Sequence, residues 1–248
     1  MAKKEKIILG LSTAGSNIKI ALKNTSGKFR AKSVKEFNQE KVFFKIIEKL
    51  LSFEKAGLKD IGGICVVKGP GRFTGIRISL TFASMMKALT GIKVFTVTAF
   101  EIFAFQVFES LGFKKWVIKA KNPKIAVILH AFKKEYFLQV FKPLLRQGYE
   151  GQAKKNTILP KSIIKPEWLD EESIKTRIKN LKGDVYIIAD IQEDADIYRL
   201  AAKNNEKAPV KISKIMPENI IKTGLIKKDE NISPLYLKPA RYEMENRK

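Results

Sequence analysis

Cysteine and histidine are almost absent, because the 248-residue sequence contains one of each. A single cysteine, Cys65, cannot form a disulfide within the chain, and it excludes a zinc site built from a cysteine cluster. The one histidine, His130, has no second histidine with which to hold a metal ion. Both lie in or at the end of apolar, β-branched runs. We therefore expect Cys65 to be a small buried core residue and His130 to be a hydrogen-bonded histidine at a strand end.

The sequence also lacks long apolar runs. Its richest stretch, residues 94–108, is interrupted by Glu101 and Gln106, whereas a membrane-spanning helix needs about 20 apolar residues. Near the N-terminus only residues 7–11 form an apolar run, which is shorter than the roughly 7 to 15 residues of a signal-peptide core. These absences predict a protein without a membrane segment, located in the cytoplasm.

Acidic residues are few compared with basic ones. The sequence contains 25 Asp and Glu and 48 Lys and Arg, which gives a net charge of +23 at pH 7. Such an excess creates a positive field over much of the surface, so nucleic acid is the natural partner to consider. The alternative is a composition that is simply rich in Lys, Ile and Asn, since no arginine-rich block or basic motif interleaved with aromatics stands out. The charge alone leaves both interpretations open.

Apolar residues are present in sufficient number for a large core, at 45% of the sequence, enough for one large domain or two small ones. The first half opens with the alternation typical of a three-stranded meander and then alternates helices with strands. We expect strands at residues 7–11, 17–22, 28–34, 61–67 and 92–97, and helices at 42–57, at 74–90 and from residue 99 onward.

A second unit is expected after Glu109, where Gly112 and the turn Asn122-Pro123 interrupt the pattern. It should contain strands at 124–129, 135–141 and 185–189, a loop at 147–155, and helices at 166–181, 194–204 and 215–225. Strands that alternate with helices in both halves indicate an α/β protein with a mixed sheet in each. We assign residues 1–110 to an N-terminal subdomain, 111–210 to a C-terminal subdomain and 211–248 to a helix and extended tail that pack back on the body.

The most informative motif is Gly69-Pro70-Gly71-Arg72-Phe73-Thr74-Gly75-Ile76-Arg77, which joins an expected strand to an expected helix. Such a glycine turn directs backbone N–H groups toward one point, where an anion or a nucleotide phosphate commonly binds. Thr74 stands where the helix N-cap belongs. The lysine of a P-loop and the ribose-binding acid of a Rossmann site are both missing, so a tight connection without a ligand is the alternative. The candidate contacts to a nucleotide or anion are Ser12, Thr13, Gly69, Gly71 and Arg72.

The helix after the turn is apolar on nearly all sides, with only a narrow polar strip. A helix that is apolar all round must be buried all round. We interpret the face turned away from the sheet as a protein interface rather than as intrachain packing. Arg77, expected at the third helical position, is a cation at the unfavourable end of the helix dipole, which also favours a partner for it. The candidate interface residues are Thr74, Ile76, Arg77, Leu80, Ala83, Ser84, Met86 and Lys87.

The nine-residue turn closely resembles the signature of the TsaB family, also called YeaZ, which differs mainly by a serine where Arg72 stands. Three further segments agree in order and position, namely residues 8–14 with the following hairpin, 131–136 and 234–239, whereas residues 147–182 diverge. The resemblance implies an actin/Hsp70/sugar-kinase-like (ribonuclease H-like) duplicated α/β fold with two mixed-sheet subdomains. In that fold the first hairpin turn, with Ser12, Thr13 and Ser16, faces the cleft between the subdomains.

Members of this family take part in making threonylcarbamoyladenosine beside the tRNA anticodon, and the resemblance implies a non-catalytic scaffold. It implies pairing with a TsaD-like catalytic subunit through the helix after the glycine turn, and association with a TsaE-like ATPase. A homodimer when the chain is alone, and ATP or ADP at the dimer boundary, follow from the same resemblance, with no cofactor required by this chain itself. The basic surface would meet tRNA.

Two positions depart from the pattern of the fold. Ser12 and His130 stand where acids usually end the first strand of each half and hold magnesium against nucleotide phosphates, and hydroxyl or imidazole groups bind magnesium poorly. We therefore expect no catalytic residue and no metal site in this chain, and the metal-binding histidine pair of TsaD is absent too. Two alternatives stay open: a kinase-like enzyme of the same fold that uses Asp190, which follows strand 185–189, and a general basic RNA-binding module.

Overall fold

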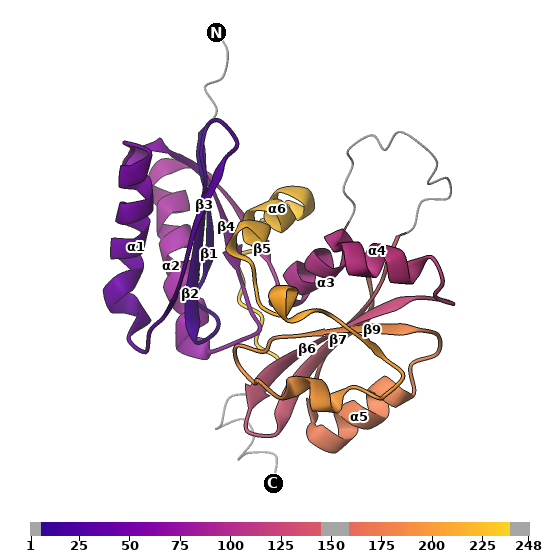
Figure 1. Ribbon diagram of the computed structural model, residues 1–248. Coiled ribbons are helices and arrows are strands. Elements are labelled where there is room, and N and C mark those ends of the chain that lie inside the picture. Colours follow the sequence, from indigo (N-terminus) through magenta and orange to yellow (C-terminus); the bar gives the residue numbers. More distant parts are fainter. Residues whose placement is uncertain (1–5, 145–158, 239–248) are drawn as a thin grey trace.

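The computed structural model describes residues 6–144 and 159–238, which form two lobes, each built around a five-stranded sheet (Figure 1). The first sheet has the strand order β3-β2-β1-β4-β5. Strands β1, β2 and β3 pair antiparallel as the expected meander, and β4 and β5 continue the sheet in parallel with β1. The strands are β1 Ile7–Ser12, β2 Asn17–Lys23, β3 Phe29–Lys35, β4 Ile61–Val67 and β5 Lys93–Val97.

The second sheet repeats this arrangement, with the order β8-β7-β6-β9-β10. Here β6, β7 and β8 are the antiparallel meander, and β9 and β10 run parallel to β6. The strands are β6 Lys124–Phe132, β7 Glu135–Lys142, β8 Lys161–Asp170, β9 Val185–Ala189 and β10 Glu206–Lys207. The same strand order in both lobes confirms the duplicated α/β architecture expected from the sequence.

Helices cover the sheets and join the lobes. Figure 1 shows α1 and α2 side by side on one face of the first sheet, with α6 on the other face, where it contacts the first-sheet strands and α3. Helix α3 also contacts β6 and β9, so it links the two lobes. The helices are α1 Gln39–Phe53, α2 Phe73–Thr90, α3 Ala99–Glu109, α4 Leu111–Val117, α5 Glu171–Lys179 and α6 Pro217–Lys227.

The central strands of the first lobe are buried on both faces because helices lie on each side of the sheet. Residues 64–67 of β4 are fully inaccessible, as their continuous β-branched run predicts. Cys65 is among them, and burial raises the pKa of its thiol to about 12. Helix α6 lies directly on the sheet because two glycines leave room for it. A Cβ atom at Gly224 would lie 2.6 Å from the Cys65 sulfur, and one at Gly10 would lie 2.7 Å from Ile221.

Two helices expected in the second lobe differ in the structure: the one at 166–181 is shorter, and the one at 194–204 is wrong. Residues 161–170 form strand β8, and α5 occupies only Glu171–Lys179, capped by the Asp170 carboxylate, which accepts a hydrogen bond from Ser173 N at 2.8 Å. Pro166 is compatible with β8 because β8 is an edge strand with a register shift beside this residue. In place of a helix at 194–204 there is one 3-10 turn, Ile197–Leu200. The loop expected at 147–155 lies outside the described residues.

The segment that follows α6 contacts both lobes. An extended segment, residues 231–238, runs beside the glycine turn, where Leu235 N donates to the Lys68 carbonyl at 2.7 Å. Lys238 then forms an ion pair with Glu135 of β7 at 2.5 Å. The segment therefore contacts the first lobe through Lys68 and the second through Glu135. Pro239, the last residue of the motif at 234–239, lies outside the described residues.

Candidate functional site

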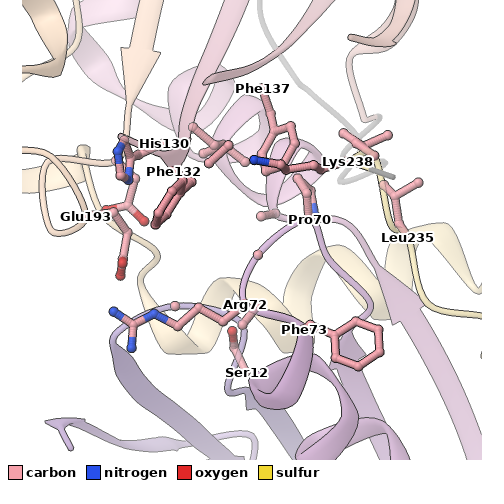
Figure 2. Close-up of a pocket in the computed structure, with 18 of the residues that line it drawn as sticks. Ser12, Pro70, Arg72, Phe73, His130, Phe132, Phe137, Glu193, Leu235 and Lys238 are labelled. Carbon is pink, nitrogen blue, oxygen red and sulfur yellow. The ribbon is translucent and has the colours of Figure 1, made fainter. Parts of the chain in front are cut away.

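A cleft of about 1430 Å³ lies between the lobes. One wall comes from the first lobe, with the end of β1 and the glycine turn, and the other comes from β6, β7 and the loop after β9 (Figure 2). The extended segment 235–238 closes one side. Of the candidate contacts from the sequence, Ser12, Gly71 and Arg72 line this cleft.

The glycine turn is packed tightly between the first hairpin loop and the extended segment. A Cβ atom at Gly71 would overlap the carbonyl oxygen of Ala14, and one at Gly69 would lie 2.5 Å from the carbonyl oxygen of Leu235. Gly69 also has a φ of +120°, which side chains rarely adopt. The N–H of Arg72 donates to the Ala14 carbonyl at 2.7 Å. Close backbone approach therefore explains these glycines, and anion binding at the turn stays a prediction.

Thr13 and Thr74 do not have the roles expected of them. Thr13 is completely buried, donates its hydroxyl to the Gly75 carbonyl at 2.5 Å, and accepts from Ser79 N at 3.3 Å. It positions the first turns of α2 and offers nothing to the cleft, so its assignment as an anion contact is wrong. The N-cap of α2 is Arg72, without a side-chain cap, and Thr74 is an exposed residue of the first turn.

Ser12 and His130 face the cleft from opposite lobes (Figure 2). His130 lies inside β6, which continues to Phe132, so it is not at the strand end as expected. Its Nε2 is 2.9 Å from the Lys133 carbonyl oxygen, and its ring meets the Tyr136 ring edge-on. A hydroxyl and an imidazole are a poor donor set for magnesium, which prefers carboxylate oxygens.

A buried lysine and two acids occupy the interior of the cleft, and the sequence did not reveal them as a group. Lys19 of β2 and Asp190, which follows β9, are both more than nine-tenths buried. Burial lowers the pKa of Lys19 and raises the pKa of Asp190 to about 6, while the opposite charge on each favours ionisation of the other. The Glu193 carboxylate accepts hydrogen bonds from Ser16 N at 2.6 Å and Ser16 Oγ at 2.7 Å, which connects the two lobes directly.

This arrangement predicts a pH-dependent contribution of Asp190 to stability. A carboxyl whose pKa rises from 3.8 to about 6 on folding stabilises the folded state fully below about pH 3.8, and that contribution is lost as the pH rises through about 6. The difference in unfolding free energy between the wild type and Asp190→Asn should therefore fall by roughly 1 to 3 kcal/mol from pH 4 to pH 7. Chemical denaturation across this range measures it. Asp196→Asn, at an exposed carboxylate, is the control, and parallel curves for Asp190→Asn and wild type would contradict the prediction.

Half of the predicted interface residues of α2 lie in the core. Ile76 and Ala83 are fully buried, and Leu80 and Met86 are nearly so, because this face of the helix packs on the first sheet. These four cannot form a free surface, and their assignment to an interface is wrong. Thr74, Arg77 and Lys87 are exposed and Ser84 is half-buried, so these four remain candidates.

An exposed apolar face does exist on α2, rotated away from the one expected. Met85 is 45% exposed, Leu89 is 74% exposed, and Ile78 is half-buried beside them. Phe44 of α1, 49% exposed, meets the ring of Phe82 edge-on at 5.7 Å and extends this face onto the neighbouring helix. We call this surface the α1–α2 stripe, comprising Phe44, Ile78, Thr81, Met85, Ala88 and Leu89. It contains no acid or base, which is unusual for a solvent-facing helix stripe.

Arg77 has its partner within the chain. It is the fifth residue of α2 rather than the third, and its guanidinium lies 3.8 Å from the centroid of the Phe73 ring. Its Nε donates to the Tyr236 hydroxyl at 3.3 Å, and the Phe73 and Tyr236 rings are 4.9 Å apart. The helix-dipole argument for an external partner of Arg77 is therefore not needed.

The two lobes of equal strand order, with a cleft between them, give the protein the actin/Hsp70/sugar-kinase-like α/β fold that the family resemblance implies. Within this class, the structure is similar to YeaZ from Pseudomonas aeruginosa, with a TM-score of 0.66 at 16% identity, covering 94% of this chain and 100% of that one. A second structure, of an uncharacterized Pseudomonas aeruginosa protein with similarity to peptidase YEAZ, gives a TM-score of 0.68 at 16% identity with the same coverage.

Sequence comparisons agree with this likeness. The family model described as TsaD, tRNA N6-adenosine threonylcarbamoyltransferase, matches residues 37–147. Two proteins named tRNA threonylcarbamoyladenosine biosynthesis protein TsaB are similar to the chain. One, from Buchnera aphidicola subsp. Schizaphis graminum, is 35% identical over 34% of this chain and 39% of its own length. The other, from Buchnera aphidicola subsp. Acyrthosiphon pisum, is 24% identical over 60% of this chain and 58% of its own.

The chain therefore spans less than two thirds of the length of these curated relatives in the matched regions. The chain is nevertheless similar to the TsaB (YeaZ) proteins in sequence and in fold, and the resemblance indicated by the glycine turn is confirmed. None of the helices in the described ranges combines the length and hydrophobicity that crossing a bilayer would require.

Proposed function

We propose that this chain is a non-catalytic scaffold subunit that pairs with a TsaD-like catalytic subunit and supports threonylcarbamoylation of adenosine beside the tRNA anticodon. The names of its relatives support the process, since two of them are called tRNA threonylcarbamoyladenosine biosynthesis protein TsaB. The observation that carries the scaffold role is the α1–α2 stripe, an exposed apolar surface on the helix that the family resemblance marks for pairing.

The chemistry of the cleft supports a role without catalysis. Ser12 and His130 occupy the positions where the fold usually has magnesium-binding acids. Asp190, the remaining acid considered for that purpose, is buried close to Lys19, whose charge already interacts with it. This set of groups does not provide the carboxylate cluster that a magnesium–nucleotide complex prefers.

Further partners belong to the same proposal. A TsaE-like ATPase would join the pair, ATP or ADP would bind at the dimer boundary, and the isolated chain would form a homodimer through the same α1–α2 stripe. The cytoplasm is the compartment in which tRNA would be modified. These parts rest on the family resemblance and on the stripe, whose apolar side chains suit a second helical surface of the same kind.

The stripe can be tested by one substitution and a matched control. Leu89→Glu, alone or with Met85→Glu, should weaken co-purification of the TsaD-like subunit from the same cell by about tenfold or more, because the carboxylate must be desolvated in an apolar interface. Leu111→Glu on α4 is the control, since Leu111 is 77% exposed and Leu89 is 74% exposed. Thermal unfolding should be unchanged in both. If Leu89→Glu retains the partner as well as Leu111→Glu does, the proposed surface is wrong.

The biological role can be tested by measuring the modified nucleoside in cellular tRNA. Removal of this chain from its cell should abolish threonylcarbamoyladenosine in hydrolysed tRNA, as measured by mass spectrometry, and the wild type should restore it whereas Leu89→Glu should not. The kinase-like alternative gives a different expectation, in which the purified chain turns over ATP and Asp190→Asn stops it. Absence of ATP turnover together with loss of the modified nucleoside would exclude the kinase-like alternative and support the scaffold.

A further inference from the structure

Three exposed phenylalanine side chains lie around the cleft between the lobes. Phe37, in the loop before α1, is 89% exposed, Phe73, at the start of α2, is 51% exposed, and Phe132, at the end of β6, is 55% exposed. All three line the cleft, although they come from different elements. Figure 2 shows Phe132 on one wall and Phe73 on the other, with Arg72 on the same wall as Phe73. We call this group the aromatic mouth.

Cationic groups stand beside the rings of the aromatic mouth. The Arg77 guanidinium is 3.8 Å from the Phe73 centroid, and the ammonium groups of Lys133 and Lys238 are 5.5 Å and 5.2 Å from the Phe132 centroid. Arg72 is exposed in the same cleft. Aromatic faces next to positive charges are the features with which proteins hold unstacked bases and the phosphates that join them.

The acids of the cleft are engaged by other groups of the chain. Asp190 is buried near Lys19, and the Glu193 carboxylate accepts two hydrogen bonds from Ser16. Glu135 of β7, beside the cleft, is paired with Lys238. The cleft is lined by four cationic side chains, Lys19, Arg72, Arg77 and Lys238, and by two acids, Asp190 and Glu193. The mouth therefore has an excess of positive charge, in a chain whose net charge is +23.

We propose that the aromatic mouth binds an unpaired strand of RNA, with bases stacked on Phe37 and Phe132 and with Arg72, Arg77 and Lys133 contacting the phosphates. The Phe73–Tyr236 pair supplies a further apolar platform beside them. The occupant is RNA rather than an apolar peptide because the rings are surrounded by cations, which an acidic phosphate backbone complements. The inference rests on the proposed function for the identity of the RNA, since a tRNA loop presents unpaired bases.

The binding of a labelled RNA hairpin with the sequence of a tRNA anticodon stem-loop tests this, measured by fluorescence anisotropy with the full chain. Phe132→Ala and Phe37→Ala should each weaken binding by about 5- to 100-fold, the loss expected for one base–aromatic stack. A fully paired RNA duplex with the same stem should bind more weakly than the hairpin to the wild type and respond little to either substitution.

Phe53→Ala is the matched control. Phe53 is 57% exposed and has the Arg30 guanidinium 5.4 Å from its ring centroid, so it resembles Phe132 in exposure and in its cation. It lies at the opposite end of α1 from Gln39, whose amide donates to the Gly15 carbonyl at the cleft wall. Hairpin binding by Phe53→Ala should equal that of the wild type.

Several results would overturn the proposal. These are no hairpin binding by the wild type, equal losses in Phe53→Ala and Phe132→Ala, or equal binding of duplex and hairpin, which would indicate charge alone. If Phe132→Ala loses the TsaD-like subunit while hairpin binding persists, the mouth is a protein-docking site instead. Failure of the scaffold role is separable, because Leu89→Glu should lose the subunit and bind the hairpin normally.

Discussion

Gly75→Ala is expected to lower the free energy of unfolding by about 3 kcal/mol or more. A Cβ atom at Gly75 would overlap the backbone carbonyl oxygen of Thr13. Neither group can move easily, because the Thr13 hydroxyl donates to the Gly75 carbonyl at 2.5 Å and accepts from Ser79 N. The added methyl group would separate the start of α2 from the end of β1. The gain in helix propensity from glycine to alanine, about 1 kcal/mol, is too small to offset this.

Denaturant unfolding measures the effect, with Gly57→Ala as its control. A Cβ atom at Gly57 would meet no other atom within 4 Å, and its φ of −124° suits any residue. Gly57→Ala should leave stability unchanged or raise it slightly, because alanine loses less conformational freedom on folding. Equal midpoints for the two variants would show that α2 can shift away from the loop after β1, contrary to the packing described above.

Ala83→Glu should unfold the protein or lower its stability by about 4 kcal/mol or more, because a carboxylate would be placed in the core. Ala83 is completely inaccessible where α2 packs on the first sheet. Ala88→Glu, in the same helix and with the same chemistry, changes an exposed position of the α1–α2 stripe. It should keep the wild-type melting temperature and lose only the partner.

Circular dichroism during heating distinguishes the two variants before any binding experiment. The comparison matters for interpretation, since a loss of co-purification by Ala83→Glu or Leu80→Glu would reflect damage to the fold rather than to an interface. A folded Ala83→Glu with a normal melting temperature would contradict the burial of this helix face.

The sequence predicted most strands of both sheets closely, because alternating apolar and polar residues indicate a half-buried strand and continuous β-branched runs indicate a fully buried one. Residues 61–67 and 185–189 match β4 and β9 without change. The start of the helix expected at 166–181 was predicted too early. Pro166 is compatible with the first turn of a helix and with an edge strand, and only the pairing of β8 with β7 shows that it belongs to the strand. Because α2 is apolar on nearly all sides, its sequence likewise does not indicate which face packs on the sheet.

The candidate site was predicted less well, since its groups are far apart in the chain. Lys19 appears in the sequence as one of many lysines, and nothing local indicates that it is buried near Asp190. The first hairpin turn was expected at the cleft, where Ser12 lies. Thr13 was assigned to a ligand because a hydroxyl beside a turn has the same sequence pattern whether it faces outward or bonds to a neighbouring helix. Phe37, Phe73 and Phe132 form no motif in sequence, and only the fold brings them to one opening.

The position of α6 has a consequence for how the protein is made. Strand β1 leaves the ribosome before the second lobe does, yet the helix that covers one face of its sheet emerges only after the whole second lobe has been synthesised. Until then Gly10 and Cys65 lie on an apolar surface open to water or to other nascent chains. Contacts between such distant segments slow folding, so the first lobe should complete its core only after translation has passed Lys227, and α6 is the segment that ends its exposure to aggregation.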